Sequence, residues 1–229
     1  MSPTSSRPSR RPGPKPTFTL DDAIDAALEE GIRDFTIGSV AKRLGVAPSA
    51  LYRVTEDRRA LVGAILDRLA QELQPSSHDL PWQDQIRGNA AELWRLVNKH
   101  EGLAMVLLTL DIYDNVRDPL ANIVTGLVKG GLKVYQALFL LDLVAETTLV
   151  SSVNYAPLKR RTASFVRESL ADNVSPEEIR SLAGDAEVQL KQKIEYLIIA
   201  MENGLLEPAV VREREQSERM VSESPFTDQ

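Results

Sequence analysis

The chain contains no cysteine and only two histidines in 229 residues. Disulfide bonds, thiol catalysis and cysteine-ligated zinc are therefore excluded, and a reducing, cytoplasmic location fits. His78 and His100 have no metal-ligating partner three or four residues away. The sequence also lacks the G-x-S-x-G pattern of many serine hydrolases. We therefore predict a protein that is not an enzyme and needs no metal or cofactor.

Long hydrophobic runs are absent as well. The most apolar stretch, residues 137–150, contains Asp142 and Glu146, and it is too short and too charged to span a membrane. The Arg- and Pro-rich first residues lack the apolar stretch of a signal peptide. Hydrophobic residues make up 43% and charged residues 26%, a balance that excludes collagen-like and wholly disordered chains. We therefore expect no membrane partner.

Proline is rare in the body of the chain, because five of the 13 prolines lie within the first 16 residues. The rest shows apolar residues at three- and four-residue spacing and no alternating segment of useful length, which predicts an all-α fold. Helix starts are expected at capping residues such as Thr19 and Asp57, and ends at Gly31, Gly45 and before Pro157. The predicted helices span 19–30, 36–44, 48–54, 57–73, 81–100, 101–110, 118–129, 132–155, 158–171, a segment starting at 175, and 186–203.

Charge is distributed unevenly along the chain. The net charge of −6 disfavours binding of a polyanion by the whole surface. Residues 1–17 hold four basic and no acidic side chains; residues 1–60 hold ten basic and eight acidic ones, which leaves 17 basic and 25 acidic for the rest. A basic N-terminal part on an acidic body favours a local anionic partner, with nucleic acid foremost. Chance clustering with a solvated tail is the alternative.

Residues 36–52 have the pattern of a helix–turn–helix. Gly45 supplies the positive φ that the turn needs, Val46 can fill the angle between the two helices, and the small Ala41 permits their close approach. The second helix, starting at Pro48, would expose its side chains to a major groove. A plain helical hairpin in a bundle is the alternative, and the basic bias favours DNA.

The segment from Thr36 to Leu61 resembles the DNA-binding segment of the tetracycline-repressor (TetR) family. The resemblance rests on VAKRLGV (40–46), the LY pair (51–52), RRAL (58–61) and the helix ahead of them. It implies an N-terminal three-helix DNA-binding domain and a C-terminal helical ligand-binding and dimerisation domain. It also implies that Thr36, Tyr52 and Arg58 contact DNA phosphates and that residues 48–50 face the bases. The predicted DNA interface is Thr36, Ala47, Pro48, Ser49, Ala50, Tyr52, Arg53 and Arg58.

Some positions depart from the family pattern. Ala47 stands where a Ser or Thr often caps the recognition helix, and Val54 and Thr55 replace a frequent aromatic pair. Because the side chains facing the bases are small, recognition would depend on methyl contacts, on Arg53 or on a basic arm in the minor groove. Alternatively, this arm is a tail that only increases solubility and does not contact DNA. Its candidate residues are Arg10, Arg11 and Lys15.

The long helix predicted over 132–155 has two distinct faces. One carries small residues suited to packing against the last long helix across a two-fold axis. The opposite face places Glu146 in an apolar stripe, where a carboxylate needs a ligand, an arginine or an open cleft. The predicted dimer interface is Ala137, Leu141, Ala145, Thr148, Ser152, Ile194, Leu197, Ile198 and Met201. The predicted ligand-binding residues are Trp94, Asn98, Asp111, Tyr113, Phe139, Leu143, Glu146 and Val150.

We therefore expect a homodimeric, ligand-responsive transcriptional regulator, a repressor that a small, largely apolar effector releases from double-stranded operator DNA. Its two recognition helices would lie about 34–36 Å apart, and the ligand would favour another spacing. An effector-independent architectural DNA-binding protein and a helical enzyme are the alternatives. The expected parts are a disordered basic arm (1–17), a DNA-binding domain (18–74), an effector and dimerisation domain (75–212) and a frayed tail (213–229).

Overall fold

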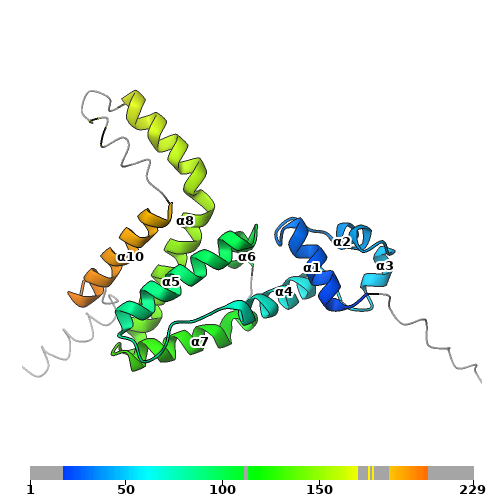
Figure 1. The fold of residues 1–229 in the computed structure, drawn as a ribbon, viewed down its shortest axis with the longest axis horizontal. Helices are drawn as coiled ribbons and strands as arrows, with labels where there is room; N and C mark the ends of the chain where they lie inside the picture. The colour runs from blue at the N-terminus through cyan, green and yellow to red at the C-terminus, as the bar shows by residue number, and fades with distance from the viewer. Residues whose placement is uncertain (1–17, 111–112, 170–174, 176, 178–185, 206–229) are drawn as a thin grey trace, which may run out of the picture.

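Nine helices and no strand make up the part of the chain that the computed structural model describes, residues 18–110, 113–169, 175, 177 and 186–205. The predicted all-α fold is therefore confirmed. α1–α3 lie at one end of the molecule, and α4 leads from them to the larger group of helices (Figure 1). The helices are α1 (Leu20–Glu30), α2 (Ile37–Arg43), α3 (Pro48–Leu51), α4 (Arg58–Glu72), α5 (Trp82–Lys99), α6 (Leu103–Thr109), α7 (Tyr113–Lys129), α8 (Val134–Ser169) and α10 (Ala186–Glu202).

Capping residues set the helix boundaries near the N-terminus as the sequence predicts. The Thr19 hydroxyl accepts a hydrogen bond from the Asp22 amide (3.2 Å), and the Asp22 carboxylate accepts one from the Thr19 amide (2.7 Å). This reciprocal pair satisfies two amides that would otherwise lack partners at the start of α1. Gly31, at φ 92°, follows the last residue of α1. Asp57 caps α4 by accepting from the Ala60 amide (2.8 Å).

Two helix boundaries predicted at prolines are wrong. α7 already begins at Tyr113, so Pro119 lies inside it, and α8 runs without a break through Pro157. A proline removes one main-chain hydrogen bond, but the flanking turns keep theirs, and α7 also packs on α4, α5 and α8. α3 ends at Leu51, earlier than predicted. The basic arm, most of 170–185 and the tail 213–229 lie outside the described residues.

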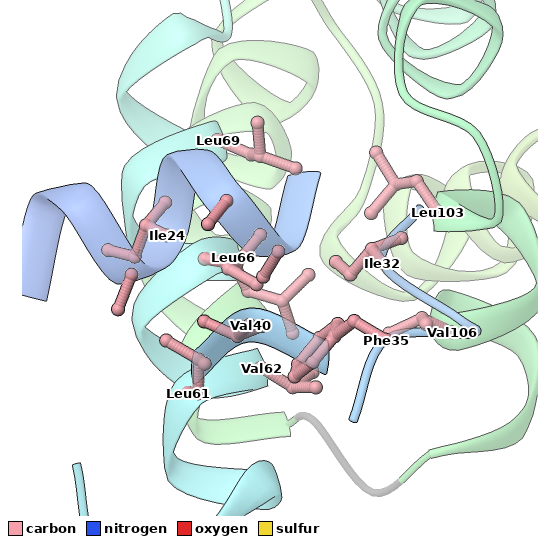
Figure 2. Close-up of a cluster of buried hydrophobic side chains, with 14 of the residues drawn as sticks. Ile24, Ile32, Phe35, Val40, Leu61, Val62, Leu66, Leu69, Leu103 and Val106 are labelled. Atoms are coloured by element: carbon pink, nitrogen blue, oxygen red, sulfur yellow. The ribbon is translucent and has the colours of Figure 1, made fainter. Parts of the chain in front are cut away.

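The core of the N-terminal helices continues into the larger domain. Ile32 and Phe35, in the loop between α1 and α2, are almost fully buried and pack in one cluster with Leu103 and Val106 of α6 (Figure 2). The Ile32 amide also donates a hydrogen bond to the carbonyl of Glu101 (3.2 Å). The N-terminal helices are thus held by α6 as well as by α4. A second apolar cluster fills the space between α5, α7, α8 and α10.

The segment Val134–Val153 of α8 is long and apolar enough to cross a membrane by length and composition alone. Ala137, Leu140 and Val144 are nevertheless buried in the second cluster, whereas Asp142 and Glu146 are exposed. One apolar face turned inward and charges turned outward are typical of a core helix in a bundle. We therefore interpret this segment as the central helix of the larger domain.

Glycine allows α7 to approach α5 closely. A Cβ atom on Gly130 would lie 2.8 Å from the main-chain nitrogen of Trp82, and one on Gly126 would lie 2.5 Å from the Gln85 side-chain oxygen. Gln85 is 1% exposed, and its amide donates to the carbonyl oxygens of Leu80 (2.8 Å) and Gly126 (2.9 Å). The glycines near the end of α7 are therefore packing residues.

We predict that Gly130→Ala lowers the free energy of unfolding by about 1–3 kcal/mol, because the new methyl group meets main chain that cannot turn away. Urea unfolding followed by circular dichroism measures this change. Gly38→Ala is the matched control, since its Cβ would find its nearest neighbour at 3.8 Å. That variant should be stabilised by roughly 0.5–1 kcal/mol, as is usual for Gly to Ala in a helix. Equal stabilities of Gly130→Ala and the wild type would contradict the packing argument.

Candidate nucleic-acid interface and internal cavity

The turn between α2 and α3 has the geometry of a helix–turn–helix. Gly45 has φ 67°, and the amide of Val46 donates to the carbonyl of Ala41 (3.0 Å), which closes the turn. Ala41 is fully buried, and Val46 packs against the N-terminal core. Because these contacts fix α3 against α2, the outer surface of α3 is presented as a rigid unit.

Most of the residues predicted to face DNA are exposed or half-exposed in the structure. Tyr52 is 58% exposed, Arg53 is exposed, and Ala50 is half-buried. Thr36 is exposed too, although its hydroxyl already accepts the amide of Ser39 (3.0 Å) as the α2 cap. Ala47, at the start of α3, makes no capping hydrogen bond, because its methyl group has no acceptor atom. Their contact with DNA stays a prediction. The exposed or half-exposed members of the set are Thr36, Ala47, Pro48, Ser49, Ala50, Tyr52 and Arg53.

Two neighbouring cations on α2, Lys42 and Arg43, have different environments, which the sequence alone does not show. Arg43 forms ion pairs with Glu29 (2.6 Å) and Glu30 (3.4 Å) of α1, which offset its charge. Lys42, its neighbour on α2, is exposed and forms no ion pair in the described part of the chain. Lys42 is therefore, like Arg53, an exposed cation of the helix–turn–helix, and the sequence analysis did not include it in the predicted interface. The two neighbours differ because the α1 carboxylates lie beside Arg43.

Arg58 has a different environment from the one predicted. Its guanidinium donates to the carbonyl oxygens of Phe35 (2.9 Å) and Ile32 (3.4 Å) and to that of Arg33, and it lies 4.8 Å from the centre of the Phe35 ring. A guanidinium has five N–H donors, and several of them are used here on the loop between α1 and α2. These contacts give Arg58 a structural role at the start of α4, and its phosphate contact stays a prediction.

A cavity of about 400 Å³ lies among α4, α5, α6, α7 and α8. Its wall is mostly aliphatic, and none of the described lining residues is basic. Such a volume is within the range of small-molecule sites. The lining residues are Leu66, Leu69, Ala70, Leu73, Pro75, Asn89, Ala90, Glu92, Leu93, Leu96, Leu103, Leu107, Asn115, Val116, Pro119, Leu120, Asn122, Ile123, Leu141, Val144, Ala145 and Leu149.

Two polar residues of α5 in the cavity wall hold the chain that follows α4. Asn89 accepts a hydrogen bond from the amide of Ser76 (2.9 Å), and Glu92 accepts one from the amide of Gln74 (3.0 Å). The hydrogen bonds from Arg95 to the Glu92 carboxylate (2.7 and 2.8 Å) hold the pKa of Glu92 below its usual value, and the Gln74 amide acts in the same direction. The one carboxylate of the wall therefore stays ionised at neutral pH.

Asn115, on α7, is the polar lining residue that reaches α4 itself. Its amide nitrogen donates to the main-chain oxygen of Gly63 (3.3 Å) and to the carboxylate of Asp67 (2.9 Å). A residue of the cavity wall is thus joined directly to the helix that carries α1–α3.

The predicted ligand-binding residues that the structure describes do not line this cavity, and ligand binding at them stays a prediction. Trp94 lines a separate hollow of about 200 Å³ between α5 and α10, and Asn98 is exposed with its amide on the Trp94 carbonyl (2.7 Å). Glu146 is exposed and Val150 is 44% exposed. Helical periodicity shows which residues share a face but not which face turns inward. The others are Phe139 and Leu143, both half-buried, and Asp111 and the side chain of Tyr113, both outside the described part.

Most residues of the predicted dimer surface are buried within the single chain, so the structure does not support their contact with a partner, and the dimer interface stays a prediction. α8 packs on α10 of the same chain, and two members of the predicted surface, Leu141 and Ala145, line the cavity. The residues that are less than 10% exposed are Ala137, Leu141, Thr148, Ile194, Ile198 and Met201; Ala145, Ser152 and Leu197 are half-buried. The exposed apolar residues of these helices are instead Val134, Leu138 and Val150 of α8 and Val188, Tyr196 and Ile199 of α10.

No family model matches the chain. Sequence relatives and structural neighbours were found, and both sets consist of transcriptional regulators. The chain is 33% identical over 109 residues to the HTH-type transcriptional repressor DrrR1 of Streptomyces coeruleorubidus, covering 45% of this chain and 40% of that protein. It is 29% identical over 137 residues to the class D tetracycline repressor protein of Escherichia coli, covering 57% of this chain and 61% of that protein. The chain thus spans about half the length of these curated relatives.

Its fold is similar to that of the TetR family protein ActR of Streptomyces coelicolor in complex with (S)-DNPA. The TM-score is 0.64 at 16% identity, over 82% of this chain and 98% of ActR. ActR has also been solved in complex with actinorhodin, with a TM-score of 0.62 to this chain, 17% identity, and coverage of 82% of this chain and 97% of ActR. The chain thus shares the fold of these TetR family proteins, and its sequence relatives are named as repressors.

Proposed function

We propose that the protein is a ligand-responsive, DNA-binding transcriptional repressor. One observation carries the proposal: a single helix, α4, packs against the helix–turn–helix at its start and lines a 400 Å³ apolar cavity further along, through Leu66 and Leu69. An occupant of the cavity therefore touches the element that carries the DNA-binding surface. DrrR1 and the class D protein are named as repressors, which supports the same direction of control.

The DNA-binding part of the proposal predicts a specific salt dependence. Arg53→Ala should weaken binding and reduce the slope of log K against log salt by about one unit, since one fewer phosphate charge is neutralised. Binding is measured by fluorescence anisotropy with a labelled duplex selected from a random library. Arg117→Ala, on α7, is the control, because Arg117 is exposed and pairs only with its neighbour Asp118 (3.3 Å). An unchanged slope for Arg53→Ala would remove it from the interface.

The effector that fits the cavity is a small, largely apolar molecule without negative charge. The wall offers aliphatic side chains, the amides of Asn89, Asn115 and Asn122, and the ionised Glu92. An anion would meet a carboxylate there and no cation, which disfavours its binding. Glu146, the carboxylate that the sequence suggests, is exposed outside the cavity and has no part in this proposal.

We further propose that the repressor is a homodimer, formed through the exposed apolar residues of α8 and α10. Tyr196 is 74% exposed, Leu138 55% and Ile199 51%, and large apolar side chains left open to water on adjacent helices mark an interaction surface. A two-fold dimer would present two recognition surfaces to successive turns of the duplex. A cytoplasmic location, where operator DNA is accessible, completes the proposal.

The rival reading is a DNA-binding architectural protein without an effector. N-phenyl-1-naphthylamine, a neutral and largely apolar dye, distinguishes the two. Under our proposal its fluorescence rises on mixing with the protein, the melting temperature increases through mass action, and selected DNA is released. Binding of DNA that the dye leaves unchanged, at dye concentrations that saturate the cavity, would favour the architectural reading. The described part of the chain contains no group of three or more His, Asp or Glu side chains that could hold a metal ion.

A further inference from the structure

Three of the polar residues in the cavity wall hold α4 or the chain that directly follows it. Asn89 and Glu92 bind main-chain amides that follow the end of α4. Asn115 binds α4 itself, nearer to the DNA-binding helices. Asn122, the fourth polar lining residue, is exposed and makes no hydrogen bond to α4 in the described structure.

The Asn115 side chain is placed where a ligand and α4 would compete for it. Its amide nitrogen donates to Gly63 and to Asp67, so both donor hydrogens are used on α4. The helices are close here, because a Cβ atom on Gly63 would lie only 3.4 Å from that nitrogen. No group in the described part of the chain donates to the carboxamide oxygen of Asn115, so the oxygen is available to a ligand donor.

We propose that Asn115 is the residue that couples occupation of the cavity to α4. A ligand that donates to the carboxamide oxygen, or whose bulk turns the side chain, draws the amide away from Gly63 and Asp67. α4 then loses its hydrogen bonds to α7 and changes position together with α1–α3. This inference rests on the proposed function, and it makes Asn115 a positioning residue that acts on DNA binding through α4.

The test compares variants on both sides of this contact in the full-length protein. Asn115→Ala removes the contact from the cavity side, and Asp67→Ala removes it from an exposed position outside the cavity. Asn122→Ala is the matched control, because Asn122 lies two turns further along the same helix and lines the same cavity. For each protein, affinity for the selected duplex is measured with and without saturating N-phenyl-1-naphthylamine, whose N–H can donate to a carboxamide. The ratio of the two affinities is the coupling factor.

We expect the dye to lower the DNA affinity of the wild type by at least about fivefold, the lower end of common coupling factors. In Asn115→Ala and Asp67→Ala, DNA affinity without dye should already be reduced, and the coupling factor should fall to about two or less. Asn122→Ala should keep the wild-type factor. A loss of stability alone would leave the coupling factor unchanged, since that factor compares two states of the same variant.

A reciprocal exchange provides a rescue. Asn115→Asp sets a second carboxylate against Asp67 and should abolish coupling, because like charges repel at this distance. Adding Asp67→Asn restores an amide–carboxylate pair with the roles reversed, so the double variant should regain much of the coupling. Absence of rescue would mean that the contact with Asp67 does not carry the effect.

The outcomes separate this inference from the proposed function. Wild-type coupling in Asn115→Ala, or an equal loss in Asn122→Ala, would overturn the role of Asn115 while leaving a ligand-responsive repressor intact. If the wild type bound no duplex, the proposed function would fail. Hydrogen exchange of the α4 amides would then test the coupling role of Asn115 without DNA. Faster exchange in Asn115→Ala and in the dye-bound wild type, but not in Asn122→Ala, would support the coupling role; equal exchange in both alanine variants would overturn it.

Discussion

Replacing Arg58 with alanine should lower the free energy of unfolding by about 2–4 kcal/mol, because charge-assisted hydrogen bonds to main-chain oxygens are lost and those oxygens remain partly buried. The guanidinium joins the first turn of α4 to the carbonyls of Ile32, Arg33 and Phe35 and lies over the Phe35 ring. These contacts link α4 to the loop that α6 also holds. Chemical unfolding of the variant and the wild type measures the loss.

The same variant separates the structural role of Arg58 from the phosphate role that its sequence context suggests. If its charge does not face DNA, the slope of log K against log salt stays at the wild-type value, measured at a temperature where the variant is fully folded. Arg58→Lys is the control for charge: it keeps the cation but cannot reproduce the planar set of donors, so most of the stability loss should remain. A stable Arg58→Ala protein with a slope reduced by one unit would restore the phosphate role.

Local signals in the sequence predicted the N-terminal half of the fold well. Thr19, Gly45 and Asp57 determine boundaries through contacts with residues three to five positions away, so neighbouring sequence is sufficient to find them. The turn at Gly45 was predicted in the same way. The prolines at 119 and 157 misled the prediction, because a local rule weighs the lost hydrogen bond without the packing and the flanking helical turns.

The larger domain was less predictable because its site depends on which face of a helix meets which neighbour. Leu141 and Ala145 lie on the helix face that the sequence suggests as a dimer surface, yet they line the cavity. The lining residues of α4, such as Leu66 and Leu69, repeat with the same period as ordinary core leucines, and nothing in their spacing marks a cavity. Asn115 gives no signal either, since its partners Gly63 and Asp67 lie about 50 residues earlier in the chain.

Leu138→Arg should convert the protein to monomers and lower its affinity for the selected duplex by about 100-fold or more. Leu138 is 55% exposed on α8, in the surface that we assign to the partner subunit, and an arginine there would be buried without a counter-charge on association. The loss of DNA affinity follows because a dimer binds two half-sites at once, and linked binding commonly adds two or more orders of magnitude. Sedimentation velocity at low micromolar concentration measures the assembly, and anisotropy measures DNA binding.

Two further arginine variants make this test specific for the surface. Leu108→Arg adds the same charge on α6, at a residue 38% exposed, and should remain dimeric with wild-type DNA affinity. Ala145→Arg places the charge at a half-buried position in the cavity wall, so it should abolish dye binding while the protein remains dimeric. Monomers from Ala145→Arg together with dimers from Leu138→Arg would return the interface to the small-residue face of α8. The opposite pattern would assign the interface to the exposed face of α8 and α10.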